Sequence, residues 1–168
     1  MTTDDHITIR RGQVDDLSFL GQMLYEAFFW NANDQRPKLS EFLNNPAFQK
    51  HLKDWGRKGD TAVIAEAKGI PSGAAWYRFR STDDHSYGFI DPATPELGMA
   101  VSVEYRSKGV GRKLLQALID VARLNGVRSM SLSVDPHNFA LHLYESEEFV
   151  KVGESGTSWT MMRKLMNP

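Results

Sequence analysis

The most constraining feature of the sequence is an apolar segment that leads through a short basic turn into the clearest helix of the chain. Leu97 to Val103 is apolar and β-like, while residues 109–126 repeat their apolar side chains at the 3.6-residue period of a helix. The leucine, isoleucine and alanine side chains of this helix fall on one stripe, and Gly126 follows as a C-terminal stop. A strand that passes so directly into an amphipathic helix favours an α/β domain.

The turn between the two elements has the composition of a phosphate-binding site. The first amides of a helix have no internal partner, and the helix dipole adds partial positive charge at the same place. Gly109 and Gly111 lack a Cβ atom, so a phosphate can approach the backbone closely. No acid lies between Tyr105 and Ile119. Four basic residues surround the turn: Arg106, Lys108, Arg112 and Lys113. These features predict a polyphosphate or pyrophosphate ligand.

The spacing of the glycines excludes two common nucleotide-binding motifs. A P-loop needs Gly, four residues and then Gly-Lys-Ser/Thr, which this turn lacks. The dinucleotide fingerprint needs a third glycine three residues after the second, where this chain has Leu114. The pattern that stands here is Arg-x-x-Gly-x-Gly.

Hydrophobic periodicity predicts the other elements and a long polar excursion over residues 81–95. The expected elements are a strand at 7–9, a helix at 14–29, a second helical region at 39–57 that Pro46 interrupts, hairpin strands at 61–67 and 73–79, a strand at 129–134, a helix at 138–147, and strands at 149–152 and 157–165. This order predicts one α/β (α+β) domain over residues 1–168, with a core of about 6–166. We expect a mixed central sheet of about 6–7 strands flanked by about four helices.

Composition narrows the range of functions. The chain has 168 residues, 41% of them apolar, and a formal net charge of −1, which argues against a strongly basic nucleic-acid module. It has no cysteine, so thiol nucleophiles, disulfides and iron–sulfur sites are excluded. The histidines show no convincing metal-ligand spacing with an acid, and we predict no metal. Neither a signal peptide nor a membrane span is evident, so we expect a cytoplasmic protein without a membrane role.

The basic turn resembles the coenzyme A site of the GNAT superfamily of N-acetyltransferases. Other parts of the chain resemble that family in the right order. Ile7 to Arg11 and Val14 to Leu17 resemble its start, and Leu97 to Val103 resembles its fourth strand. Its late helix and strand are resembled by Asn138, Ala140, Leu143-Tyr144-Glu145 and Phe149. The resemblance thus covers nearly the whole chain and implies a single-domain GNAT-like fold. Two positions depart from the pattern. Glu148 stands where many members have glycine, and Asn138 lies six rather than seven residues before Tyr144.

The resemblance implies that acetyl-CoA is the co-substrate. Its pyrophosphate would lie on the amides of the glycine turn, its pantetheine arm would pair with the edge of the strand before it, and the Val101 amide would steady the developing oxyanion. The implied cofactor-binding residues are Ala100, Val101, Val103, Arg106, Lys108, Gly109, Val110, Gly111, Arg112 and Asn138.

Two residues are implied to handle protons while the amine attacks the thioester directly. Tyr144 matches the family position that protonates the leaving thiolate, and Glu96 is our candidate base for the incoming ammonium, directly or through a water. These two residues and Asn138 also have purely structural interpretations. Tyr144 can be a core tyrosine, Glu96 a solvated carboxylate at a strand end, and Asn138 a helix cap rather than a ligand.

The function predicted from these residues is transfer of an acetyl group to a primary amine of a small molecule or peptide. Two alternatives stay open. One is a non-catalytic acyl-CoA-binding sensor, which needs neither Tyr144 nor Glu96. The other is a transferase that modifies a protein N-terminus or a lysine. The family resemblance also favours a homodimer, and we expect no nucleic-acid partner.

Overall fold

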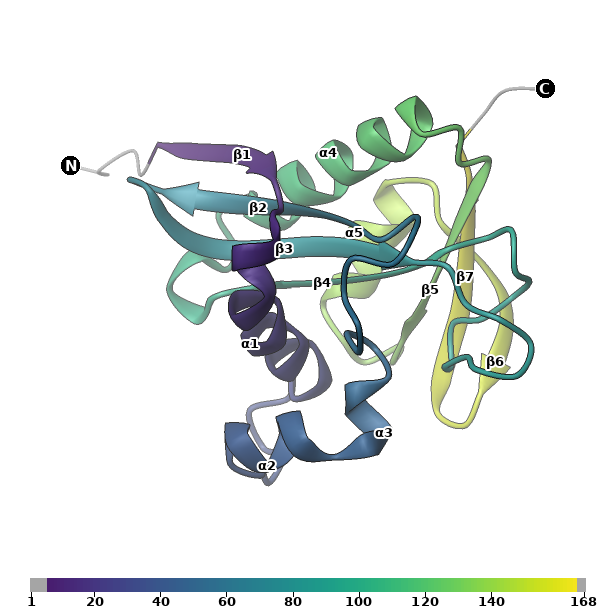
Figure 1. The fold of residues 1–168 in the computed structure, drawn as a ribbon, viewed down its shortest axis with the longest axis horizontal. Coiled ribbons are helices and arrows are strands. Elements are labelled where there is room, and N and C mark those ends of the chain that lie inside the picture. Colours follow the sequence, from purple (N-terminus) through teal and green to yellow (C-terminus); the bar gives the residue numbers. More distant parts are fainter. Residues whose placement is uncertain (1–5, 166–168) are drawn as a thin grey trace. The chain divides into compact units, whose positions relative to one another are not determined.

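The computed structural model describes residues 6–165, so the ends of the predicted domain, 1–5 and 166–168, lie outside the described residues. The strands are β1 (Ile7–Arg11), β2 (Thr61–Ala67), β3 (Ile70–Arg78), β4 (Glu96–Val101), β5 (Ser129–Val134), β6 (Val150–Ser155) and β7 (Ser158–Lys164). The helices are α1 (Leu17–Phe28), α2 (Leu39–Asn44), α3 (Pro46–Gln49), α4 (Val110–Leu124) and α5 (Ala140–Ser146), with short 3₁₀ turns η1 (Val14–Asp16) and η2 (Val103–Tyr105). Figure 1 shows the strands and helices, which follow one another in the order β1, α1–α3, β2–β4, α4, β5, α5, β6, β7.

The strands form a seven-stranded mixed sheet, as predicted. They are hydrogen-bonded in the order β1-β2-β3-β4-β5-β7-β6. β1 pairs antiparallel with β2, and β7 pairs antiparallel with both β5 and β6. β4 runs parallel to β5, with Glu96 opposite Ser131. The prediction of an α/β fold with a mixed central sheet is therefore confirmed.

Pro46 divides the predicted second helix in two. α2 ends at Asn44, and α3 begins at Pro46, where a proline is tolerated because the first helical N–H has no partner in any case. The Asn45 side chain accepts a hydrogen bond from the Ala47 amide at 3.0 Å and so caps the new helix. The structure consequently has five α-helices within the described residues, where about four were predicted.

The predicted strand at 97–103 is too long at its end. β4 stops at Val101, and the chain then bends into η2, where the Tyr105 amide donates to the Ser102 carbonyl at 2.9 Å. Val103 therefore lies in a 3₁₀ turn rather than on a strand edge, and its side chain is 63% exposed. The expectation that Val103 lies on a strand edge is therefore wrong, while its contact with pantetheine stays a prediction.

By internal contacts the chain divides into two compact units. The first contains residues 6–76 and 99–118, and the second contains residues 77–98 and 119–165. In the first unit, Phe42 of α2 is 1% exposed. Its ring lies 5.3 Å from Tyr25, 5.8 Å from Phe28, 5.7 Å from Phe29 and 4.4 Å from Phe48, measured between centroids. These aromatic contacts hold α2 and α3 beside α1 (Figure 1).

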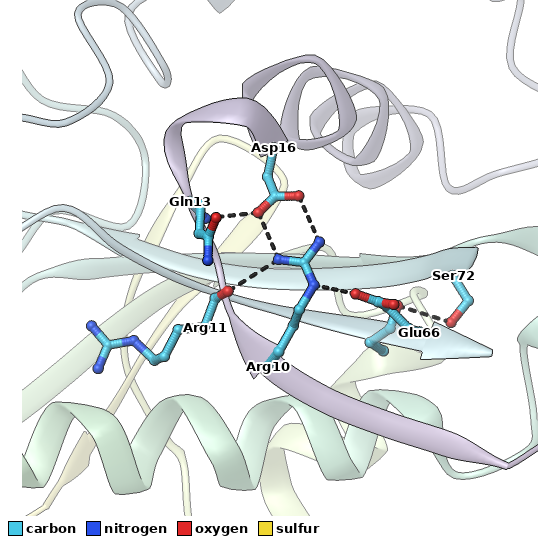
Figure 2. A network of polar contacts seen from close by, with 7 residues as sticks. Arg10, Arg11, Gln13, Asp16, Glu66 and Ser72 are labelled. Atoms are coloured by element: carbon cyan, nitrogen blue, oxygen red, sulfur yellow. Dashed lines mark hydrogen bonds and ion pairs between the residues drawn. The ribbon is translucent and has the colours of Figure 1, made fainter. Parts of the chain in front are cut away.

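An arginine on β1 joins three elements of the first unit (Figure 2). The two terminal nitrogens of Arg10 donate to the carboxylate oxygens of Asp16 at 2.8 Å each, and its Nε donates to Glu66 on β2. Asp16 also accepts the Gln13 amide at 2.7 Å, just before α1. The Arg10 hydrogen bonds hold the pKa of the Asp16 carboxyl below its ordinary value. The start of α1 is thereby tied to the β1–β2 pair.

We predict that Arg10→Gln lowers the free energy of unfolding by about 2 kcal/mol at pH 7, because it leaves a buried carboxylate without its bidentate partner. The lowered pKa of Asp16 means that this stabilisation is present above the ordinary aspartate pKa of about 4 and is lost as the pH falls through the folded-state pKa. Urea unfolding at pH 7 and pH 3 should show the deficit shrinking at the lower pH.

The matched control is Arg11→Gln, since the exposed Arg11 side chain points away from this network in Figure 2. It should change the free energy of unfolding by no more than about 0.5 kcal/mol. An equal deficit for Arg10→Gln at both pH values would contradict the ionic explanation and point to lost packing of the arginine stem.

Candidate functional site

The basic turn is shaped by two residues with positive φ angles. After β4 and η2, Ser107 has a φ of 59° and Gly109 a φ of 81°, and α4 begins at Val110. The Lys113 amide donates to the Gly109 carbonyl at 3.2 Å, which closes the first turn of α4. A Cβ placed on Gly109 would meet no described atom within 4 Å. Gly109 is therefore required by its backbone conformation, and the space beside it is open to a ligand.

The end of β4 packs unusually closely against its neighbours in the first unit. A Cβ on Gly73 of β3 would lie 3.0 Å from the Leu114 side chain, 3.1 Å from the Ala100 carbonyl oxygen and 3.4 Å from the Cα of Val101. Only a residue without a side chain fits there unless its neighbours shift. Gly73 thus sets how near α4 and the end of β4 can lie, a role that no feature of the sequence indicates.

The Arg106 side chain donates hydrogen bonds to other residues of the protein. Its Nε donates to the Val101 carbonyl at 3.0 Å, and its Nη2 donates to the Glu26 carboxylate on α1 at 3.1 Å. The side chain is 37% exposed. The sequence predicts that Arg106 adds charge for a phosphate, but it gives no sign of Glu26, which lies 80 positions earlier in the chain.

Glu96, the candidate base, belongs to the second unit and is held by the polar excursion that precedes it. The Ser86 hydroxyl donates to the carboxylate and lies 2.7 Å from both oxygens, and the Gly88 amide donates to one oxygen at 3.3 Å. A Cβ on Gly88 would lie 2.9 Å from the same carboxylate and 2.8 Å from the Leu132 backbone. Ser86 and Gly88 of the excursion thus hold Glu96 in place, whereas Asp83 and nearby residues are exposed.

Tyr144, the candidate acid, lies on α5 in the second unit. It is 6% exposed, and its ring meets Phe149 edge-on at 5.9 Å between centroids. Burial raises the pKa of the phenol above its ordinary value, so the hydroxyl keeps its proton at neutral pH. The position fits both a proton donor and a core tyrosine.

Asn138 directs its side chain to the start of α5. Its Oδ1 accepts a hydrogen bond from the Ala140 amide at 3.0 Å, and its own amide donates to the Asp135 carbonyl at 2.9 Å. Asn138 thus satisfies the first amide of α5 from the position before the N-cap residue Phe139, close to the helix-cap role predicted as an alternative. The cofactor role of Asn138 stays a prediction.

A pocket of about 340 Å³ in the first unit is lined by Leu24, Phe42, Leu43, Phe48, Gln49, Leu52 and Lys53. None of these is a predicted site residue. Over residues 6–165, no group of three or more histidine, aspartate or glutamate side chains is placed to hold a metal ion. Within the same range, no helix is both long and apolar enough to span a bilayer.

A family model matches most of the chain, and a curated relative matches about half of it. The acetyltransferase (GNAT) family model matches residues 22–149. The chain is 35% identical over 94 residues to the L-amino acid N-acyltransferase MnaT of Escherichia coli (strain K12), which covers 55% of this chain and 51% of that protein. The chain therefore spans about half the length of this curated relative.

Solved structures share the fold. The PaiA N-acetyltransferase of Thermoplasma acidophilum, in complex with coenzyme A, matches with a TM-score of 0.70 and 17% identity over 95% of this chain and 99% of its own. YncA of Salmonella typhimurium, with its cofactor acetyl-CoA, matches with a TM-score of 0.66 and 24% identity over 96% and 95%. These likenesses confirm the predicted GNAT-like fold. With the family model matched over residues 22–149, they lead to one conclusion: this chain belongs to the acetyltransferase (GNAT) family.

Proposed function

We propose that the protein is an acetyl-CoA-dependent N-acetyltransferase that passes an acetyl group directly to a primary amine of a small molecule or peptide. The observation that carries this proposal is the turn from β4 into α4, where a positive-φ glycine leaves open space beside the first amides of a long helix. The names of the similar proteins support it, since they include an L-amino acid N-acyltransferase and structures with coenzyme A or acetyl-CoA.

The turn supplies what a pyrophosphate needs. The amides of Gly109, Val110 and Gly111 lie at the start of α4, where no helical acceptor is available to them. Lys108 and Arg112 add positive charge on either side of these amides, and α4 has no acid in its first turn. Ala100 and Val101, at the end of β4, would face the pantetheine arm through their backbone groups.

Bound acetyl-CoA supplies an acyl carbon already activated as a thioester. The residues of the chain then handle charge and protons. The Glu96 carboxylate accepts a proton from the incoming ammonium, directly or through a water, so that the neutral nitrogen can attack. The Val101 amide donates to the carbonyl oxygen as that oxygen gains negative charge. The Tyr144 hydroxyl gives its proton to the sulfur as the C–S bond breaks, and the nitrogen gives up its second proton as the amide forms, which restores the Tyr144 hydroxyl through solvent. The new C–N bond thus replaces the C–S bond without a covalent enzyme adduct.

The two alternatives from the sequence keep different parts of this scheme. An acyl-CoA-binding sensor would keep the basic turn and have no use for proton transfer by Tyr144 or Glu96. A transferase for protein N-termini or lysines would keep all three roles and differ in its acceptor. The homodimer and the cytoplasmic location remain predictions from the sequence.

We predict that the wild-type protein binds acetyl-CoA and that Gly111→Glu weakens this binding at least about 100-fold, because a carboxylate would stand where the pyrophosphate lies. Isothermal calorimetry measures both affinities. Gln116→Glu adds the same charge to the exposed face of α4 beyond the first turn and should bind nearly as well as wild type. Well-folded wild-type protein that binds no acetyl-CoA would overturn the proposed function.

We predict that Tyr144→Phe lowers kcat about 100-fold, in the range expected for loss of a general acid, and leaves the Kd of acetyl-CoA unchanged. Phenylalanine preserves the edge-on packing against Phe149, so stability should change little. The assay follows thiol release with the best acceptor from a panel of amines that includes L-amino acids and peptides. Unchanged kcat would assign Tyr144 to the core, and wild-type protein inactive with every amine would favour the sensor.

We predict that Glu96→Gln lowers kcat/KM for the amine about 100-fold at pH 7, because an amide cannot accept the ammonium proton. The deficit should shrink as the pH rises toward the pKa of the free amine, since more of the acceptor then arrives already neutral. Asp83→Asn removes an exposed charge from the same excursion and serves as the electrostatic control. Equal losses in the two variants would instead indicate general attraction of a cation.

A further inference from the structure

The peptide unit that ends β4 is held at both of its polar atoms. The carbonyl oxygen of Val101 accepts the Nε of Arg106 at 3.0 Å, and the amide of Ser102 donates to the carbonyl of Ser72 on β3 at 2.8 Å. Because a peptide unit is planar, these two bonds fix its orientation, and they limit the two soft dihedrals of Val101. Ser72 is itself fully buried, with its hydroxyl donating to Ala65 at 3.2 Å.

The arginine that makes one of these bonds is in turn held by Glu26. One carboxylate oxygen of Glu26 accepts the Nη2 of Arg106 at 3.1 Å, and Nη1 of Arg36 lies 3.3 Å from that same oxygen and 3.2 Å from the other. Arg36 also donates to the carbonyl of Phe29 at 2.6 Å, which anchors it at the end of α1. Glu26 is therefore shared by two cations, and its side chain is mostly buried.

We propose that Glu26 and Arg106 are positioning residues: they hold the Val101–Ser102 peptide unit, and through the backbone conformation of Val101 they orient the Val101 amide toward the thioester carbonyl. This inference rests on the proposed function, in which the Val101 amide donates to that carbonyl. Glu26 holds the guanidinium, the guanidinium holds the Val101 carbonyl, and the backbone conformation of Val101 follows. Arg106 then acts through Val101, and the phosphate charge comes from the other basic residues of the turn.

The chemistry of the contact explains why the residue is an arginine. Its guanidinium is a rigid planar fork, so two of its nitrogens can meet Val101 and Glu26 at the same time. A lysine keeps the charge but presents a single ammonium on a flexible stem. Arg106→Lys therefore separates positioning from phosphate attraction, because it removes the first and preserves most of the second.

The test uses acetyl-CoA labelled with ¹³C at the thioester carbonyl, bound to the protein without any acceptor. Difference infrared spectroscopy reads the carbonyl stretch, which falls when a hydrogen bond polarises the group, and calorimetry reads the Kd. We expect a lowered stretch in wild type. In Arg106→Lys and in Glu26→Gln the stretch should return toward its value in water, while the Kd stays within about threefold. The double variant should show no more than the larger single effect, because both residues act through one link.

Arg36→Lys is the matched control, since it makes the same change on the other side of Glu26 and leaves the Arg106–Val101 bond in place. It should keep the wild-type stretch. A normal stretch in Arg106→Lys with a Kd raised tenfold or more would overturn the inference and make Arg106 a phosphate ligand. An equal change in Arg36→Lys would also overturn it, as general loosening of α1. Absence of acetyl-CoA binding in wild type would reject the proposed function itself.

Discussion

The close approach of backbone at Gly73 is the constraint on which the candidate cofactor site depends. Because this position has no side chain, the end of β4 and the Leu114 side chain of α4 can both lie against β3. The Ser102 amide then reaches the Ser72 carbonyl, and β4 ends at a defined residue. A shift of even a few tenths of an ångström here would move the turn that follows, since only eight residues separate the end of β4 from the start of α4.

Local chemistry made part of this site predictable from the sequence. The period of α4, its basic N-terminal turn and the glycine at position 109 are local features, and the structure shows each in the expected place. The end of β4 was misjudged because Val103 is as apolar as a strand residue, while the bend is set by hydrogen bonds in η2. The division of the second helix at Pro46 was anticipated, and Asn45 supplies the cap that makes it complete.

The residues that hold Arg106 and Glu96 in place could not be predicted from local sequence. Glu26 meets Arg106 across 80 positions, and neither helical period nor residue type marks one glutamate of an amphipathic helix as special. Ser86 and Gly88 lie in a segment that looks like an ordinary polar loop, yet the hydroxyl and the amide hold Glu96 and the glycine is packed tightly. Such residues become visible only when distant parts of the chain are placed together.

The basic residues of the turn thus have two different roles, phosphate binding and support of the backbone. A cation that binds phosphate must keep its charge accessible, whereas a cation that holds the backbone must donate its hydrogen bonds to protein acceptors. Arg106 belongs to the second kind by its contacts with Val101 and Glu26. Glu26 is arranged in a similar way, because two arginines compensate its negative charge while its carboxylate orients one of them, Arg106. A basic motif read only as charge would miss that its first arginine shapes the backbone on which the acyl group is expected to lie.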